Sequence, residues 1–204
     1  IKTGTHSGLQ TALLTSKFGM MPEEAFHAFV EYKDSPHLNL SGIHLHIGSQ
    51  NPEPEAYAEA FHMLTDSMMR IRDAAGSELQ HINLGGGFPV NYLRENGIST
   101  QFPPERREMF SADFEPAAAV RNAWDEAKLF ADDCGAPHIF DGLTLVLEPG
   151  RSIIADAAIC LTTVRNRKER PVAEKTDNRP LTTDHWILTD AGFNLLLSME
   201  TYKW

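Results

Sequence analysis

Short apolar runs alternate with longer amphipathic segments through most of the chain. Four runs end in small or polar residues and predict buried strands: residues 42–48, 81–85, 143–148 and 186–190. Three segments carry apolar residues at helical spacing and predict helices: residues 22–34, 54–75 and 117–134. In the second of these, one apolar face is formed by Tyr57, Phe61, Leu64, Met68 and Ile71. Because strands alternate with helices, we expect βαβ units and a parallel sheet.

The pattern changes after Arg151. Residues 152–164 are apolar and small, and no helical pattern follows them. Residues 165–184 are charged and contain two prolines, which predicts an exposed loop before the last strand. Residues 96–107 predict a second long loop, of a kind that is often functional. We therefore expect an α/β region at residues 1–151 and the beginning of a β-rich domain at residues 152–204.

Composition narrows the possible partners and setting. The net charge of -10 argues against nucleic acid or an anionic membrane as a partner. No apolar run approaches membrane-spanning length, and no signal peptide opens the sequence. The two cysteines, Cys134 and Cys160, do not make a disulfide framework, so a cytoplasmic setting is the simplest interpretation. The chain begins at Ile1 rather than at methionine, and we expect it to be an internal fragment.

A glycine triplet, Gly85, Gly86 and Gly87, directly follows the second predicted strand. Glycine permits positive φ and leaves the backbone bare, so consecutive N–H groups can converge on an anion such as phosphate. The alternative is a tight turn without a ligand, because glycine runs are common in turns.

The first predicted strand carries two histidines. Strand alternation places His44 and His46 on one face, and Ser49 follows at the strand end, where a hydroxyl can bind phosphate. These histidines could instead be core residues that neighbouring polar groups satisfy. They could also bind zinc. The candidate zinc ligands are His44, His46, His81 and Asp190.

The third predicted strand ends in Glu148-Pro149-Gly150-Arg151. A carboxylate can stabilise a protonated pyridine nitrogen, and an arginine can bind a phosphate or a carboxylate through two hydrogen bonds. An internal ion pair that closes a turn is the alternative. The glycine triplet, the His-Ile-Gly-Ser segment and this motif each lie at the end of a predicted strand. The strand ends of a parallel barrel converge on one site.

Five motifs occur in an order that resembles one enzyme family: Ser16-Lys-Phe-Gly19, His44-Leu-His-Ile-Gly-Ser-Gln50, Asn83-Leu-Gly-Gly-Gly-Phe-Pro-Val90, Glu148-Pro-Gly-Arg151 and Asp190-Ala-Gly192. They are similar to the motifs of diaminopimelate decarboxylases, which are alanine-racemase-like (fold type III) pyridoxal-phosphate enzymes. The resemblance implies an α/β fold: the second half of a TIM (β/α)8 barrel that runs into a C-terminal β domain.

The resemblance also assigns roles to residues of this chain. It implies that His46 stacks on the cofactor ring and that Glu148 contacts the pyridine nitrogen, so that both are catalytic. It implies that Arg151 also binds a substrate carboxylate. The implied cofactor-binding residues are His46, Ser49, Gly85, Gly86, Gly87, Glu148, Pro149, Gly150 and Arg151. It implies no metal.

Some family features would lie outside this sequence. The Schiff-base lysine would precede Ile1, and Lys17 belongs to a different motif and does not replace it. A cysteine-containing segment that completes the neighbouring subunit's site would follow Trp204. After Asp190-Ala-Gly192 the family usually has Arg-Pro and then a tyrosine, whereas residues 193–199 read FNLLLSM. The substrate amino acid therefore stays open.

These features predict a pyridoxal-phosphate-dependent amino-acid decarboxylase that takes a small-molecule substrate and forms a homodimer with a shared active site when full length. The fragment alone is expected to be inactive. One alternative is a zinc-dependent TIM-barrel hydrolase, which leaves the glycine triplet and Glu148 unexplained. The other is a cofactor-binding homologue without turnover.

Overall fold

The computed structural model describes residues 18–51, 53–92, 111–155, 157, 159–171, 183–192 and 195. The chain divides into two compact units, Ile1–Ala155 and Asp156–Trp204. Three sequence features fall wholly or largely outside the described residues: the first half of the Ser16–Gly19 motif, the predicted loop 96–107, and residues 193–199 apart from Leu195.

The first unit contains three parallel strands in the order β1-β2-β3. They are β1 (Gly42–His44), β2 (His81–Asn83) and β3 (Thr144–Val146). Helices separate them along the chain: α1 (Pro22–Tyr32) precedes β1, α2 (Glu55–Ala75) joins β1 to β2, and α4 (Pro116–Asp133) precedes β3. This arrangement confirms the predicted α/β class with a parallel sheet.

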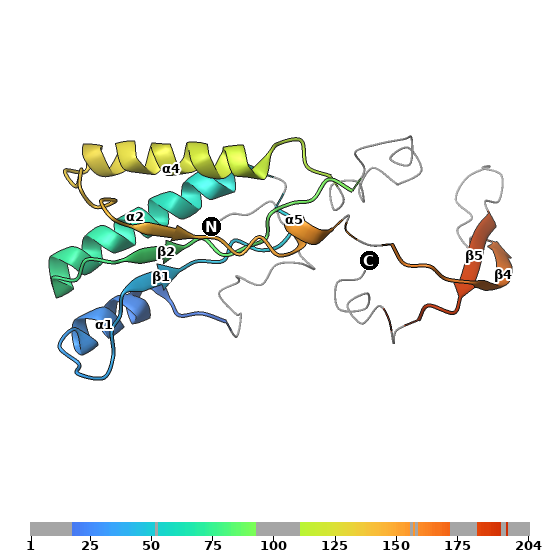
Figure 1. Cartoon of the computed structure of the whole chain (residues 1–204), viewed down its shortest axis with the longest axis horizontal. Coiled ribbons are helices and arrows are strands. Elements are labelled where there is room, and N and C mark those ends of the chain that lie inside the picture. Colours follow the sequence, from blue (N-terminus) through green and yellow to red (C-terminus); the bar gives the residue numbers. More distant parts are fainter. Residues whose placement is uncertain are drawn as a thin grey trace. The chain divides into compact units, whose positions relative to one another are not determined.

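The core lies between the strands and the two long helices, which run side by side in Figure 1. The predicted apolar face of α2 is confirmed, since all five of its residues are buried. They pack with Ile82 and Leu84 from β2 and its continuation, and with Val120 from α4. The helix ends where Gly76 takes a left-handed conformation (φ 65°) and its N–H donates to Arg72 O.

Aromatic contacts join the helices to each other and to the segment after β2. Phe61 of α2 meets Trp124 of α4 edge to face, with ring centroids 5.6 Å apart. Tyr57 stacks on Phe88, which follows the glycine triplet, at 5.8 Å. Burial of these large rings stabilises the packing of the two helices with each other and with the segment after β2.

The second unit contains an antiparallel pair, β4 (Val164–Pro171) and β5 (Thr183–Thr189). The predicted loop at residues 165–184 is therefore wrong for residues 165–171 and for residues 183 and 184. The charged side chains from 165 to 170 are exposed, so they show no buried alternation, and backbone pairing with β5 forms the strand.

A short helix, α5 (Arg151–Ile154), begins directly after Gly150. The sequence pattern did not predict it, because a single turn is too short to show helical periodicity. In the part of the chain that the structure describes, none of the helices combines the length and the apolar character needed to cross a membrane.

Candidate active site

The carboxyl ends of the three strands stay paired beyond the strands themselves. Leu45 N–H donates to Asn83 O over 2.9 Å, and Glu148 N–H donates to Gly85 O over 2.8 Å. This pairing holds the residues after β1, β2 and β3 next to one another, at the end of a parallel sheet where such folds place their chemistry. His46, Gly85 and Glu148 therefore belong to one surface.

Asn83 connects the carboxylate to the glycine triplet. Its Nδ2 donates to Glu148 Oε1 over 2.7 Å, and its Oδ1 accepts the N–H of Gly85 over 2.8 Å. Because the backbone N–H fixes the amide oxygen, the NH₂ group must point to the carboxylate. The sequence interpretation missed this role, because the contact with Glu148 joins residues 65 positions apart.

Each glycine of the triplet lies against neighbouring backbone. A β-carbon on Gly85 would lie 2.8 Å from Leu45 O and 3.2 Å from His46 Nδ1. One on Gly86 would collide with the carbonyl oxygen of Glu148, and one on Gly87 with that of Gly48. Gly85 and Gly87 also have positive φ, 72° and 81°. Only glycine allows the three strand ends to approach this closely.

His46 is half-buried beside His44 and Glu148. Burial lowers the pKa of His46 below its ordinary value of 6.5, His44 lowers it further, and Glu148 opposes both. The environment therefore favours a neutral imidazole, whose flat face can lie against an aromatic ring.

The loop after β1 is bound to the loop after the glycine triplet. Gln50 Nε2 donates to Val90 O over 2.7 Å, and Val90 N–H donates to Gln50 Oε1 over 3.0 Å. Asn51 N–H donates to Gly87 O over 3.2 Å. Ser49 lies in the middle of this bound loop. The sequence interpretation placed Gln50 next to Ser49 at the strand end, where backbone N–H can hold phosphate, but gave the Gln50 side chain no role.

The Glu-Pro-Gly-Arg motif turns the chain from β3 into α5. Gly150 has φ 45° and caps the helix, and Ser152 Oγ donates to Pro149 O over 2.7 Å. Arg151 is the first residue of α5 and is partly buried. The structure thus brings His46, the glycine triplet and Glu148 together, with Ser49 on the adjoining loop and Arg151 just after the carboxylate.

Residues 1–155 match a family model described as the pyridoxal binding domain of pyridoxal-dependent decarboxylases. The chain belongs to this family. The match confirms the resemblance inferred from the five motifs.

Individual proteins similar to this chain agree with the family match. The chain is 29% identical over 201 residues to diaminopimelate decarboxylase of Methanocaldococcus jannaschii and 30% identical to that of Pseudomonas aeruginosa. The crystal structure of the M. jannaschii enzyme matches 98% of this chain with a TM-score of 0.66 at 28% identity. The Helicobacter pylori enzyme, complexed with L-lysine, matches 98% with a TM-score of 0.59 at 25% identity.

The chain spans 38% of the M. jannaschii sequence and 39% of the P. aeruginosa sequence. It likewise covers 39% of the M. jannaschii structure and 41% of the H. pylori structure. These relatives support the predicted fold, a TIM barrel with a β domain, of which the described residues of this chain form three adjacent parallel strands and one antiparallel pair.

The candidate site residues of this chain fit pyridoxal phosphate chemically. The cofactor has a pyridine nitrogen that can be protonated, an aromatic ring and an anionic phosphate. Glu148, held by Asn83, would suit the nitrogen. Neutral His46 would suit the ring. Backbone N–H groups where the loops after β1 and β2 pack together would suit the phosphate.

The zinc interpretation receives no support. Among the described residues, no three histidine, cysteine, aspartate or glutamate side chains gather as a metal site requires. His81 lies at the opposite end of β2 from the glycine triplet, paired with Gly42. Asp190 belongs to the second unit, where its carboxylate accepts from Thr162 Oγ1 and Thr163 N–H.

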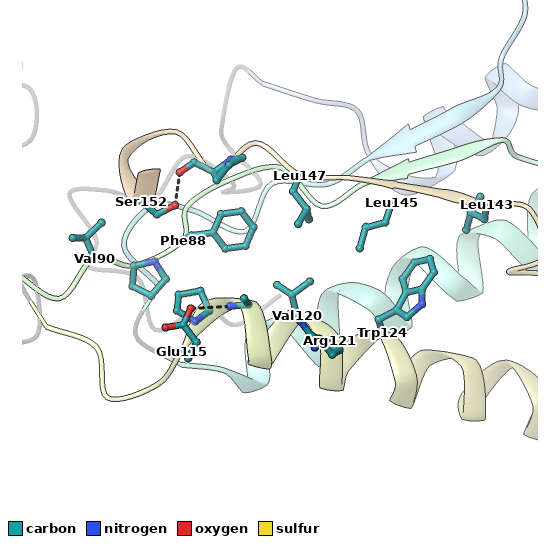
Figure 2. Close-up of a pocket in the computed structure, with 14 residues that line it drawn as sticks. Phe88, Val90, Glu115, Val120, Arg121, Trp124, Leu143, Leu145, Leu147 and Ser152 are labelled. Atoms are coloured by element: carbon teal, nitrogen blue, oxygen red, sulfur yellow. Dashed lines mark hydrogen bonds between the residues drawn. The ribbon is translucent and has the colours of Figure 1, made fainter. Parts of the chain in front are cut away.

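A groove of about 660 Å³ opens between α4 and β3, and Figure 2 shows that it is lined mainly by apolar side chains. Leu143, Leu145 and Leu147 point towards Val120 and Trp124 of the helix. Strand alternation turns Glu148 to the other face of the sheet. Glu148 therefore does not line this groove, whereas Pro149 of the same motif does.

Proposed function

We propose that the whole protein is a pyridoxal-phosphate-dependent amino-acid decarboxylase and that this chain contributes part of its cofactor site. One observation carries the proposal. Glu148, bound by Asn83, lies beside the glycine triplet and His46 at the carboxyl ends of adjacent parallel strands. An anionic group, a flat neutral ring and backbone N–H groups at one strand edge match the three parts of the cofactor.

In this proposal Glu148 keeps the pyridine nitrogen protonated, and His46 stacks on the ring. When bound, the cofactor supplies an electron sink for the electron pair left by the departing carboxylate. Glu148 strengthens that sink by stabilising the positive charge, and Asn83 holds the Glu148 carboxylate in place.

The phosphate cradle comprises the Ser49 hydroxyl, Gly85, Gly86, Gly87 and the Pro149-Gly150-Arg151 backbone. Arg151 has a second proposed role, which is to bind a substrate carboxylate through its guanidinium. Both roles follow from the family motifs rather than from a bound ligand.

The proposal extends to the rest of the protein. Residues 1–151 form part of the cofactor-binding barrel, and residues 152–204 begin the β domain. The enzyme is a cytoplasmic homodimer with a shared active site. An amino acid of the diaminopimelate class is the first substrate to test, because diaminopimelate decarboxylases are among the relatives.

The test uses the purified full-length protein. Its visible spectrum and metal content are measured, and release of CO₂ is followed with meso-diaminopimelate, lysine, ornithine and arginine. Bound pyridoxal phosphate with CO₂ release from one amino acid supports the proposal. Bound cofactor without release from any of them favours the non-catalytic homologue. Stoichiometric zinc without visible absorption overturns the proposal in favour of the hydrolase.

A further inference from the structure

Gln50 is a glutamine in an unusual position. Its side chain is 4% exposed, and its backbone has φ 52°, in the left-handed region that residues with side chains seldom occupy. Its amide makes both available kinds of hydrogen bond to a single residue, donating to Val90 O and accepting from Val90 N–H. The side chain thus pairs with the backbone of Val90 as a neighbouring strand would.

The residues around Gln50 explain why this pairing matters. Ser49, the proposed phosphate ligand, lies between Gly48 with φ 97° and Gln50 with φ 52°. Both flanking residues have a left-handed backbone conformation. The direction in which the Ser49 side chain points therefore depends on these two backbone angles. The carbonyl of Gly48 lies directly against Gly87, where a β-carbon would not fit.

Two contacts hold these turns to the glycine triplet. One is the Asn51 N–H to Gly87 O hydrogen bond, at 3.2 Å. The other is the Gln50–Val90 pair, at 2.7 and 3.0 Å, three residues beyond the triplet. Together they bind the loop with the serine hydroxyl to the loop with the bare glycine backbone. A phosphate cradle built from both loops requires this fixed spacing.

We propose that Gln50 is a positioning residue that sets the geometry of the phosphate cradle by fixing the Ser49 loop against the glycine triplet. The inference rests on the proposed function, since it assigns Gln50 to the phosphate end of that site. Gln50 acts through Ser49 and Gly87 and does not itself contact the cofactor. Its effect should therefore be confined to ligands that carry the phosphate.

Glutamine has the right groups for this contact. Val90 presents one donor and one acceptor in a buried place, and an amide supplies one of each at the required reach. Methionine at position 50 would keep the bulk and length but leave both groups of Val90 unpaired. An ionised glutamate would keep the acceptor for Val90 N–H but place its second oxygen against the Val90 carbonyl oxygen. A protonated glutamate could donate to that carbonyl.

The experiment compares binding of pyridoxal phosphate with binding of pyridoxal, which lacks the phosphate, to full-length apo-protein. We expect Gln50→Met to raise the Kd for pyridoxal phosphate about tenfold or more, as for a lost contact to a charged group. The Kd for pyridoxal should change less than about twofold. Gln80→Met is the matched control, because Gln80 is exposed at the other end of β2 and should change neither Kd.

A second variant keeps the proposal testable if Gln50→Met folds poorly. Gln50→Glu should weaken pyridoxal phosphate binding at neutral pH, relative to wild type at the same pH, and recover towards wild type as the new carboxyl protonates. Equal weakening of both ligands, or no change in either, would overturn the positioning role. Wild-type protein that binds neither ligand would instead overturn the proposed function.

Discussion

In the proposed function, Glu148 is the residue whose charge matters most. Its side chain accepts from Asn83 Nδ2 over 2.7 Å, at the strand edge that also holds the glycine triplet. In the full-length enzyme, Glu148→Gln keeps the shape and removes the charge. We expect kcat to fall roughly a hundredfold or more, as for loss of an electrostatic stabiliser. The phosphate cradle should still bind the cofactor, which a spectroscopic titration measures. Early melting with unchanged kcat in the folded fraction would assign Glu148 a structural role.

Asn83 should act through Glu148. Asn83→Ala removes the amide that orients the carboxylate, and we expect kcat to fall about tenfold, as for a hydrogen bond to a charged group. If Asn83 works only by holding Glu148, adding Asn83→Ala to Glu148→Gln should cost little more than Glu148→Gln alone. Steady-state kinetics of the four proteins in this cycle measure the coupling. Fully additive losses would show that the two residues act independently.

His46 should make stability depend on pH. Burial holds its pKa below 6.5 in the folded state, so the unfolded chain takes up a proton first as the pH falls. The free energy of unfolding should therefore decrease as the pH drops below about 6.5. His46→Asn should make this decrease shallower, measured as the urea midpoint of full-length apo-protein against pH. His37→Asn, at an exposed loop histidine, should leave the slope unchanged. An unchanged slope in His46→Asn would contradict the prediction.

At the scale of the elements, close backbone packing after β2 is the feature most sensitive to substitution. Gly87 and Gly76 both have positive φ, but only a β-carbon on Gly87 would meet backbone, the carbonyl of Gly48. In the full-length protein we expect Gly76→Ala to lower the free energy of unfolding by about 1 kcal/mol. Gly87→Ala should lower it by roughly 2 to 5 kcal/mol, because overpacking adds to the backbone strain.

Chemical denaturation of both variants tests this difference. Gly76→Ala controls for the left-handed backbone, since nothing lies within 4 Å of its added carbon. Equal losses in the two variants would mean that the loops after β1 and β2 can separate at little cost. The close approach would then not constrain the cradle.

The elements show what the sequence could and could not predict. Helices α2 and α4 were found because apolar spacing reports a buried face, and all five predicted residues on α2 are buried. Strand β4 was missed because its described side chains are exposed and its stability comes from backbone pairing. The contacts of Asn83 and Gln50 were missed because each joins residues at least 40 positions apart, with Glu148 and Val90 respectively. No local pattern encodes such contacts.

At the scale of the molecule, the chain contains one sector of a larger arrangement. The structural match with the M. jannaschii enzyme covers 98% of this chain but only 39% of that enzyme. The sector presents a polar edge at the strand ends, while its other face packs against α2 and α4. In the proposed function, groups at that edge bind and orient the cofactor from one side. In the proposed function, the covalent attachment of the cofactor and the remaining walls of the site belong to other parts of the protein.

This division leads to a prediction for the 204-residue chain by itself. We expect it to release no CO₂ from any amino acid that the full-length protein decarboxylates, even when pyridoxal phosphate is added. The proposed roles here include the partner of the pyridine nitrogen and part of the phosphate cradle, but not the lysine that would attach the cofactor. The walls of the site that the proposal assigns to other parts of the protein would also be missing, and access of water would weaken the electrostatic effect of Glu148. Circular dichroism would establish that the chain is folded, and full-length Glu148→Gln would give the baseline for an impaired enzyme. Turnover by the chain above that baseline would show that all the essential groups lie within these residues and that the lysine has been assigned to the wrong place.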